Sequence, residues 1–557
     1  MIKRAILTAL VALSIALPLE AEVKGMSSRV LFMMRRCQVQ EAVDLYRQYA
    51  LELGREDYDI LQQMGLVLLE QGANSRDAEE QLMAIFGAGV SAHDLATPIL
   101  VQGLNNDNPQ IRLASLNMLA QRQTDTADEL INRAINCQEP LIRLEGCYLL
   151  AKKKHPAAVG QTEALMIKLP PATWFLFAEI FATIGDVRSI RQLRRLMNHE
   201  DNLARLAAIV AVAEHGRDDL LPQIRQLSTH LDTSQQEACA GALGALGDQG
   251  SISRLKKLAE SKAAHVRLAA YIALNKLGCT EYAEQITALA REGNVLAIYA
   301  LGDVEGSQDL LATLADCDNS TVQINATLSL LRLRDRRCLP GLRKLLIKNR
   351  RDTSYVKVVS HGKILTAWKA VPTATLESTP LAIELSTNLR ESCLGAAVEL
   401  PEEDFLELAE AILDKQQCEL VPLAIQLIEN IASDKAIAIL QKHQQKLGAP
   451  LVRNYCNLAL FKLDVEGPYS DNLLSWVRKQ SHVDMIRFRP VVPWELRDAA
   501  ASHQITPEET SKLFISSVET LAARQDDSGV QVLLDLIRDG NAKNRYALAG
   551  LLIRTIQ

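Results

Sequence analysis

The chain contains residues that can ligate metal ions, but their spacing does not repeat. Ten histidines are scattered over 557 residues, and two of them stand beside a glutamate in the pairs His199-Glu200 and Glu214-His215. Imidazole and carboxylate groups together suit transition metals. Because one pair is reversed relative to the other and no further copies follow on successive helices, the sequence predicts no metal site.

Motifs of the common enzyme classes are missing from the sequence. No Gly-rich phosphate loop, G-x-S-x-G elbow or H-E-x-x-H motif occurs, and the ten cysteines include no C-x-x-C pair. We therefore expect no catalytic residue, no cofactor, no enzymatic activity and no small-molecule substrate. An even number of cysteines permits disulfides, but their spacing does not say which cysteines pair.

A strongly basic segment is followed directly by an acidic one. Residues 331–370 carry a net charge of +10, and residues 371–434 carry −11. The two segments can neutralise each other, or the basic one can attract an acidic protein or peptide; nucleic acid is a third and weaker alternative, because no aromatic residues are interleaved for base stacking. The candidate partner-binding residues in the basic segment are Arg336, Arg337, Arg343, Lys344, Lys348, Arg350 and Arg351.

A second candidate surface lies near residues 485–494. Pro490 and Pro493 prevent this stretch from forming one regular helix, so we expect an exposed loop. Arginine and aromatic side chains are enriched at the energetic centres of protein interfaces. The candidate residues here are Arg487, Phe488, Arg489 and Trp494.

These candidates are embedded in a repeat of thirty-one residues. Gly185, Gly216, Gly247 and Gly278 recur at this interval and predict helix ends. An arginine recurs eleven residues before such a stop, with exceptions at Trp174 and Gln236. A positive charge in the first turn opposes the helix dipole, so we expect each arginine to need an acidic or carbonyl partner and to serve the repeat itself. The repeated arginines are Arg112, Arg143, Arg205, Arg267, Arg453 and Arg545.

Two short helices fit into each repeat, and neither can bury its apolar stripe alone. Stacking successive pairs solves this problem and produces a solenoid. The composition agrees, since 48% of residues are hydrophobic, only 4% are aromatic, and the chain has just 27 glycines and 18 prolines. The sequence therefore predicts an all-α, right-handed α-α superhelix of about fifteen units.

The repeat resembles a known family. Val266 to Gly278, Ala204 to Ala208 and Ala238 to Asp248 are similar to the pattern V-R-x-x-A-A-x-A-L-x-x-L-G-D of short HEAT repeats, the PBS-lyase-like or E–Z type. The resemblance implies a scaffold that binds a protein or peptide along an extended surface. It leaves two alternatives open: a lyase-like or hydroxylase-like enzyme that handles a cofactor, and a nucleic-acid-binding HEAT protein.

The first residues look like an export signal, with Lys3 and Arg4 before a short apolar run. With the repeat, this indicates an exported bacterial HEAT-repeat protein, periplasmic or secreted, that meets a membrane only if the segment is not cleaved. The sequence thus predicts a signal peptide at 1–21, a helical cap with a weak TPR resemblance or a separate TPR module at 22–89, regular repeats at 90–335, and degenerate repeats at 336–557 with irregular segments near 350–380 and 464–511.

Overall fold

The computed structural model describes residues 25–347, 353–372, 380–417, 419–487, 508–524 and 526–554. Several sequence predictions fall outside these residues, namely the signal peptide and the candidate partner-binding residues Lys348, Arg350, Arg351, Phe488, Arg489 and Trp494. The described chain is almost entirely helical and forms two compact units, one from residues 135–443 and one that joins residues up to 134 with those from 444 onward.

Short polar residues and glycines set the limits of the repeated helices. Asp201 accepts a hydrogen bond from the backbone N–H of Leu203, and Asp232 does the same for Ser234 one repeat later. Such side chains satisfy donors that have no partner within the helix. The predicted stops at Gly185, Gly216, Gly247 and Gly278 are confirmed, because all four glycines have a positive φ between 63° and 89°.

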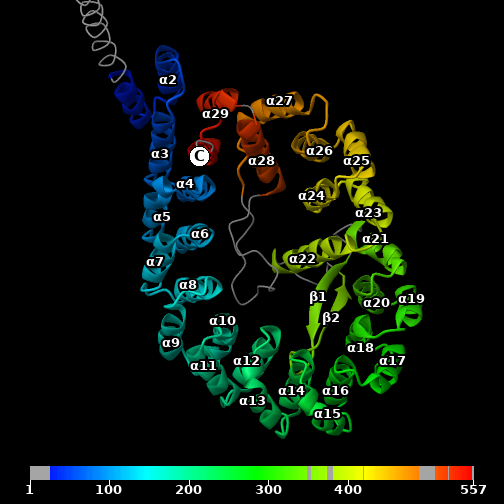
Figure 1. Ribbon diagram of the computed structural model, residues 1–557. Helices are drawn as coiled ribbons and strands as arrows, with labels where there is room; N and C mark the ends of the chain where they lie inside the picture. Colours follow the sequence, from blue (N-terminus) through cyan, green and yellow to red (C-terminus); the bar gives the residue numbers. More distant parts are fainter. Residues whose placement is uncertain are drawn as a thin grey trace, which may run out of the picture. The chain divides into compact units, whose positions relative to one another are not determined.

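The unit formed by residues 135–443 is a stack of helix pairs (Figure 1). Each pair packs on the next one, as α12 packs on α14 and α14 on α16. The predicted all-α superhelical architecture is confirmed here. Its helices are α8 (Pro140–Lys152), α9 (Ala158–Lys168), α10 (Phe177–Ile184), α11 (Val187–Met197), α12 (Asn202–Glu214), α13 (Leu221–Leu227), α14 (Thr233–Ala245), α15 (Ile252–Leu258), α16 (Ala264–Lys276), α17 (Ala283–Arg291), α18 (Val295–Ala300), α19 (Gln308–Ala315), α20 (Ser320–Arg332), α21 (Leu339–Ile347), α22 (Pro380–Ala397), α23 (Glu402–Asp414), α24 (Val421–Ile431) and α25 (Asp434–Gln444).

One β-hairpin interrupts this stack. Strands β1 (Ser354–Val359) and β2 (Thr366–Val371) pair in antiparallel register, with Ser354 opposite Val371 and Val359 opposite Thr366. The hairpin lies within the stretch near 350–380 where the sequence predicts an irregular insertion. Its strands pack on α18, α20 and α22 (Figure 1).

The other unit brings together the two ends of the described chain. The last helix, α30, packs on α3 and α4. The helices of this unit are α2 (Val39–Leu53), α3 (Tyr58–Ala73), α4 (Ala78–Ser91), α5 (Thr97–Leu104), α6 (Pro109–Ala120), α7 (Asp125–Ala134), α26 (Pro450–Lys462), α27 (Tyr469–Ser481), α28 (Glu509–Arg524), α29 (Asp526–Asp539) and α30 (Asn544–Arg554). Among the described residues, no helix combines the length and the apolar character that crossing a bilayer requires.

Small residues allow α30 to approach α4 closely. A Cβ atom added at Gly550 would lie 2.1 Å from the carbonyl oxygen of Gly87, and one added at Gly87 would lie 2.1 Å from that of Tyr546. An ion pair accompanies this contact, since Lys543 Nζ lies 2.6 Å from Glu79 Oε2, and a second one joins α29 to α2, where Arg538 Nε lies 2.8 Å from Asp44 Oδ1. The segment expected to cap the first repeat therefore packs against the last described helix.

Charged side chains also link neighbouring pairs in the stack of residues 135–443. Arg225 on α13 donates two hydrogen bonds to Asp248, from Nε to Oδ2 at 2.8 Å and from Nη2 to Oδ1 at 2.6 Å. Asp248 is buried, with 5% of its surface exposed. The hydrogen bond from Arg225 is the largest influence on the Asp248 carboxyl, and its pKa lies below the usual value.

Gly550→Ala should destabilise the protein because its methyl group meets the backbone of α4. We expect a loss of about 1–3 kcal/mol, as for other overpacked contacts, measured as a lower thermal unfolding midpoint of the full chain. Gly160→Ala on α9 is the matched control, because a Cβ there has nothing within 4 Å; it should leave stability unchanged or raise it slightly. Equal effects of the two changes would contradict the close packing of α30 on α4.

Asp248→Asn should lower stability at neutral pH by roughly 1–2 kcal/mol, because a buried charged hydrogen bond is lost. The lowered pKa of Asp248 means that its ionised form stabilises the fold above the unfolded value of about 3.9, and that this contribution disappears as pH falls through the folded pKa. Urea unfolding between about pH 7 and about pH 3 should therefore show a loss of stability relative to wild type that is largest at pH 7 and shrinks as the pH falls below about 3.9. Asp219→Asn, at an exposed carboxylate on the same stack, should leave the free energy of unfolding unchanged at both pH values.

Candidate functional site

The repeated arginines contact carbonyl groups close to them in the chain. Arg205 Nη1 donates to the carbonyls of His199 and Glu200, both at 2.7 Å, and Arg267 Nη1 donates to that of Ser261 at 2.8 Å. In the other unit, Arg545 Nε donates to the carbonyl of Ile537 at 2.8 Å. The carbonyls of His199, Glu200 and Ser261 lie in the loop that follows the preceding helix, whereas that of Ile537 lies in the last turn of α29, where the helix leaves carbonyls without partners. Arg143 is buried, and the side chains of Arg112 and Arg453 are partly buried.

Three arginines of the basic segment pair with the acidic segment that follows it. Arg336 Nη2 donates to Asp404 Oδ1 at 2.8 Å, Arg343 pairs with Glu407, and Arg334 pairs with Glu399. Arg337 instead pairs with Asp335 and Asp309, each at 2.6 Å. Mutual neutralisation of the two segments therefore accounts for Arg336 and Arg343, two of the partner-binding candidates that the sequence marks.

Lys344 differs from these arginines. It lies on α21, its side chain is exposed, and no carboxylate of the described residues pairs with it. It lines a groove of about 450 Å³ between α20, α21 and the start of β1. The groove therefore has one unpaired positive charge on its wall.

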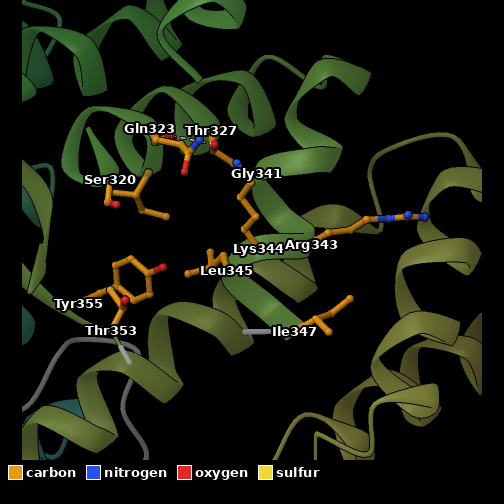
Figure 2. A pocket seen from close by; sticks show the side chains of 11 residues that line it. Ser320, Gln323, Thr327, Gly341, Arg343, Lys344, Leu345, Ile347, Thr353 and Tyr355 are labelled. Atoms are coloured by element: carbon orange, nitrogen blue, oxygen red, sulfur yellow. Dashed lines mark hydrogen bonds between the residues drawn. The ribbon is translucent and has the colours of Figure 1, made fainter. Parts of the chain in front are cut away.

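Apolar and polar side chains share the rest of this groove. Figure 2 shows Ser320, Gln323 and Thr327 on the side of α20, Lys344 and Leu345 on α21, and Tyr355 opposite them on β1. Helix α21 lies close to α20 here, because a Cβ at Gly341 would be 2.1 Å from Thr327 Oγ1. Burial raises the pKa of Tyr355, so its phenol stays protonated. The arrangement can hold a short extended segment that carries an acidic side chain.

The second candidate surface is represented by Arg487 alone in the described chain. Its backbone N–H donates to Ser511 Oγ at 3.0 Å, and its carbonyl accepts from the N–H of Glu508 at 2.8 Å. Arg487 belongs to the unit that contains the chain ends, whereas the groove belongs to residues 135–443.

The hairpin that forms one wall of the groove is anchored on α20 by Asn325. This side chain is fully buried; its Nδ2 donates to the carbonyl of Trp368 at 2.6 Å, and its Oδ1 accepts from the N–H of Trp368 at 2.9 Å. The Asn325 amide thereby makes the pair of hydrogen bonds that a neighbouring strand would make with β2. Neighbouring repeats have Ala207 and Ala269 at the same distance from the helix start.

The tip of the hairpin fits onto α14 through two glycines. A Cβ at Gly362 would lie 2.7 Å from the backbone nitrogen of Ala238, so the tip rests directly on the helix. A Cβ at Gly241 would lie 2.5 Å from Ile364 Cγ1, so the missing side chain leaves room for that isoleucine. Only a residue without a side chain permits either approach.

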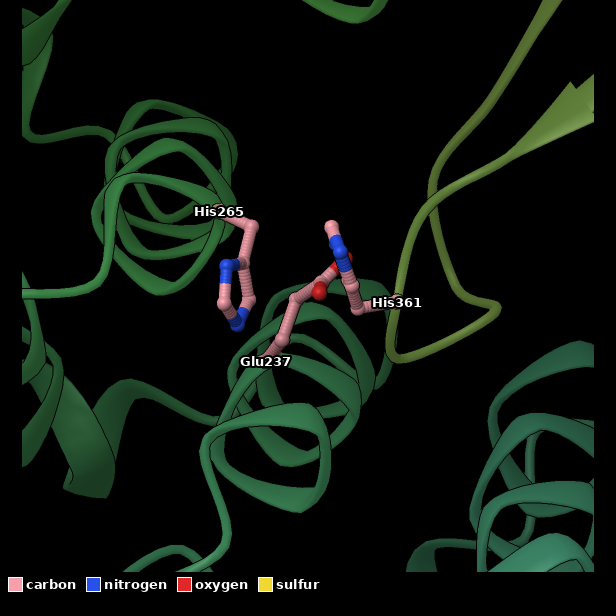
Figure 3. A group of neighbouring side chains, drawn as sticks. All are labelled: Glu237, His265 and His361. Carbon is pink, nitrogen blue, oxygen red and sulfur yellow. The ribbon is translucent and has the colours of Figure 1, made fainter.

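Three potential metal ligands meet at this tip. Glu237 on α14, His265 on α16 and His361 on the hairpin each offer a ligand atom, and these atoms all lie within 4.8 Å of one another. Figure 3 shows the three side chains converging from their separate elements. Within the described ranges, this is the one group of three such residues that could hold a metal ion.

Several contacts act on the carboxyl group of Glu237. Its side chain is fully buried, and burial raises its pKa, while Ser360, the N–H of Gly362 and the two imidazoles oppose that rise. Oε2 accepts a hydrogen bond from the Gly362 N–H at 2.8 Å, but Oε1 has no hydrogen-bond partner. His265 Nε2 is likewise buried without a hydrogen-bond partner, and its ring centre lies 4.6 Å from that of His361.

Comparisons with known proteins find only distant structural similarities. No protein-family model and no curated protein matches the chain. Among solved structures, the karyopherin Kap121p bound to the extreme C-terminus of the phosphatase Cdc14p matches at 13% identity and a TM-score of 0.38, over 91% of this chain and 63% of its own length. UNC-45 from Drosophila melanogaster matches at 13% identity and a TM-score of 0.31, over 95% of this chain and 93% of its own length. Human deoxyhypusine hydroxylase matches at 14% identity and a TM-score of 0.20, over 68% of this chain and 99% of its own length. The chain thus spans less than two thirds of that karyopherin.

The Glu237, His265 and His361 cluster was not predicted from the sequence. The two adjacent His-Glu pairs considered there lie outside this cluster, since His215 Nε2 lies 2.8 Å from Glu179 Oε1 and the ring centre of His199 lies 4.9 Å from that of Trp174, with the ring planes at 44°. A usable signal does exist in the repeat. At the position where neighbouring repeats have the buried Leu206 and Leu268, this one has a glutamate.

Proposed function

We propose that the chain is an exported, non-enzymatic scaffold that binds a protein or peptide partner, and that an acidic segment of this partner occupies the groove between α20, α21 and β1. The observation that carries this proposal is the exposed, unpaired Lys344 on the wall of a preformed groove of about 450 Å³. The repeat architecture supports it, because stacked helix pairs create extended binding surfaces without a catalytic centre.

Recognition in this groove combines one charge with close packing. A carboxylate of the partner would pair with Lys344, while the partly exposed Ile347 offers apolar surface to neighbouring side chains. Gln323 contributes a polar wall, although its Nε2 already donates to the carbonyl of Ala315 at 2.8 Å. Electrostatic complementarity of this kind chooses the partner and speeds association more than it adds affinity.

Internal pairing limits how far the basic segment can attract a partner. Arg336 and Arg343 have carboxylate partners within the same unit, so their charges are screened at a distance. We therefore expect the salt dependence of binding to reflect about one ionic contact at this groove rather than a field of many positive charges.

Lys344→Glu should weaken binding of acidic peptides by about tenfold, because a favourable pair becomes a repulsive one. Fluorescence polarisation of labelled peptides of equal length, one set rich in Asp and Glu and one rich in Lys and Arg, measures the effect in the full chain. Wild type should prefer the acidic set, and this preference should shrink between about 50 mM and about 500 mM NaCl.

The matched control for this charge reversal is Lys257→Glu, at an exposed lysine on α15 that does not line the groove. It should bind the acidic peptides as wild type does. An equal loss in both variants, or equal binding of acidic and basic peptides by wild type, would contradict the assignment of the groove.

Export predicts that the chain produced in a bacterial cell is processed at its start. Cell fractionation followed by N-terminal sequencing should find the protein outside the cytoplasm and beginning near Glu22, because the first segment has the charge and apolar pattern of a signal peptide. A variant that lacks residues 2–21 should stay in the cytoplasm. An intact Met1 on cytoplasmic protein would contradict export.

A further inference from the structure

We propose that Glu237, His265 and His361 bind a divalent first-row transition metal ion, of which Zn²⁺ is the representative. This ion would hold the tip of the β-hairpin against α14 and α16. The site rests on the described side chains and does not depend on whether the groove binds a peptide. It assigns a role to three residues that the scaffold function leaves unexplained.

The first argument is the position of Glu237 in the repeat. Leu206 and Leu268 occupy this place in the neighbouring repeats and are 4% and 2% exposed, whereas Glu237 is fully buried. Burying a carboxylate costs several kcal/mol unless a charge or a set of hydrogen bonds compensates it. A leucine would pack here without that cost, so we infer that the Glu237 carboxylate interacts with a compensating charge.

The second argument is the set of atoms that the protein leaves unsatisfied. Gly362 donates to Glu237 Oε2 at 2.8 Å, which orients the carboxylate and leaves Oε1 free. His265 Nε2 is buried and also lacks a hydrogen-bond partner. Buried polar atoms are rarely left in this state, and an unplaced ion is one of the established reasons for it. Both atoms belong to the same cluster of three ligands.

The donor set identifies the class of ion. Two imidazoles and one carboxylate suit Zn²⁺, Fe²⁺, Co²⁺ and related ions, whereas Mg²⁺ and Ca²⁺ prefer oxygen ligands. A +2 charge also compensates the carboxylate beside the two imidazoles, whose ring centres lie 4.6 Å apart.

The geometry allows binding with small adjustments. Ligand atoms on a tetrahedral zinc ion lie about 3.3 Å apart, given bonds of about 2.0–2.1 Å, so the separations of up to 4.8 Å must shorten by roughly 1.5 Å at most. Rotation of the exposed His361 side chain on the hairpin tip can provide this movement. Its exposure also gives the ion a path from solvent and leaves a fourth position for water.

The close contacts of the hairpin tip fit it to the surface of α14. Gly362 and Gly241 both have neighbours that forbid a side chain, and both lie at the cluster or one helical turn from it. The glycine at 241 replaces the valine and isoleucine found at Val210 and Ile272 in the adjacent repeats. Helix α14 thus differs from the neighbouring repeats at Glu237 and Gly241, one turn apart, and both residues contact the tip of the hairpin.

Metal binding to the purified full chain tests the proposal. Protein treated with a chelator and then titrated with Zn²⁺ in a competition assay should bind one high-affinity equivalent, and Co²⁺ should give a visible absorption spectrum of nitrogen and oxygen ligation. His361→Ala should weaken Zn²⁺ binding by more than about 100-fold, beyond the effect of losing an outer hydrogen bond. Because His361 lies on an exposed loop, this variant should fold. His230→Ala, at an exposed histidine outside the cluster, should bind Zn²⁺ as wild type does.

Two further measurements separate a fastening ion from a purely polar contact. Zn²⁺ should slow hydrogen exchange at residues 360–365 and raise the thermal midpoint of wild type but not of Glu237→Gln, whereas Mg²⁺ should do neither. Absence of Zn²⁺ binding by wild type, or equal affinity in His361→Ala, would overturn the proposal and leave Glu237 as a hydrogen-bonding anchor for the hairpin alone. Loss of peptide binding in Lys344→Glu is independent of all these outcomes.

Discussion

Everything in the described chain depends on apolar stacking between helix pairs that are too small to be stable alone. A pair from one repeat buries only part of its stripe, so the rest must pack against its neighbours, as α12, α14 and α16 do. This constraint fixes which positions must be leucine or alanine in each unit. It also makes any polar residue at such a position conspicuous, because packing provides no reason for it.

The β-hairpin is the main consequence of two such exceptions. Asn325 replaces an alanine on α20 and holds β2 by its backbone, while Glu237 replaces a leucine on α14 and meets the tip. Between these two anchors the hairpin lies across several helices, and Tyr355 on β1 forms one wall of the groove that contains Lys344. The proposed ligand groove and the proposed metal site thus share one structural element.

The sequence predicts the regular features well because they are local. A thirty-one-residue period reports helix ends directly, and the positive φ of Gly247 and Gly278 confirms them. The opposing charges of adjoining segments likewise become ion pairs such as that of Arg336 with Asp404. The tip of the hairpin could not be placed in this way, because Gly362 and Glu237 are 125 residues apart and nothing in the period connects them. The packing of α30 on α3 and α4 escaped prediction for the same reason.

The packing of α30 on α3 and α4 can form only late in the synthesis of the protein. Lys543 and Glu79 are 464 residues apart, so α3 and α4 leave the ribosome long before α30 exists to cover them. Until then the small-residue surface around Gly87 has no partner, and a nascent chain with unpaired apolar surface is prone to aggregate or to recruit chaperones. The stack of residues 135–443 can form progressively, pair by pair, whereas the unit that holds both ends must wait for the last helix. That unit therefore completes its packing only after α30 joins α3 and α4.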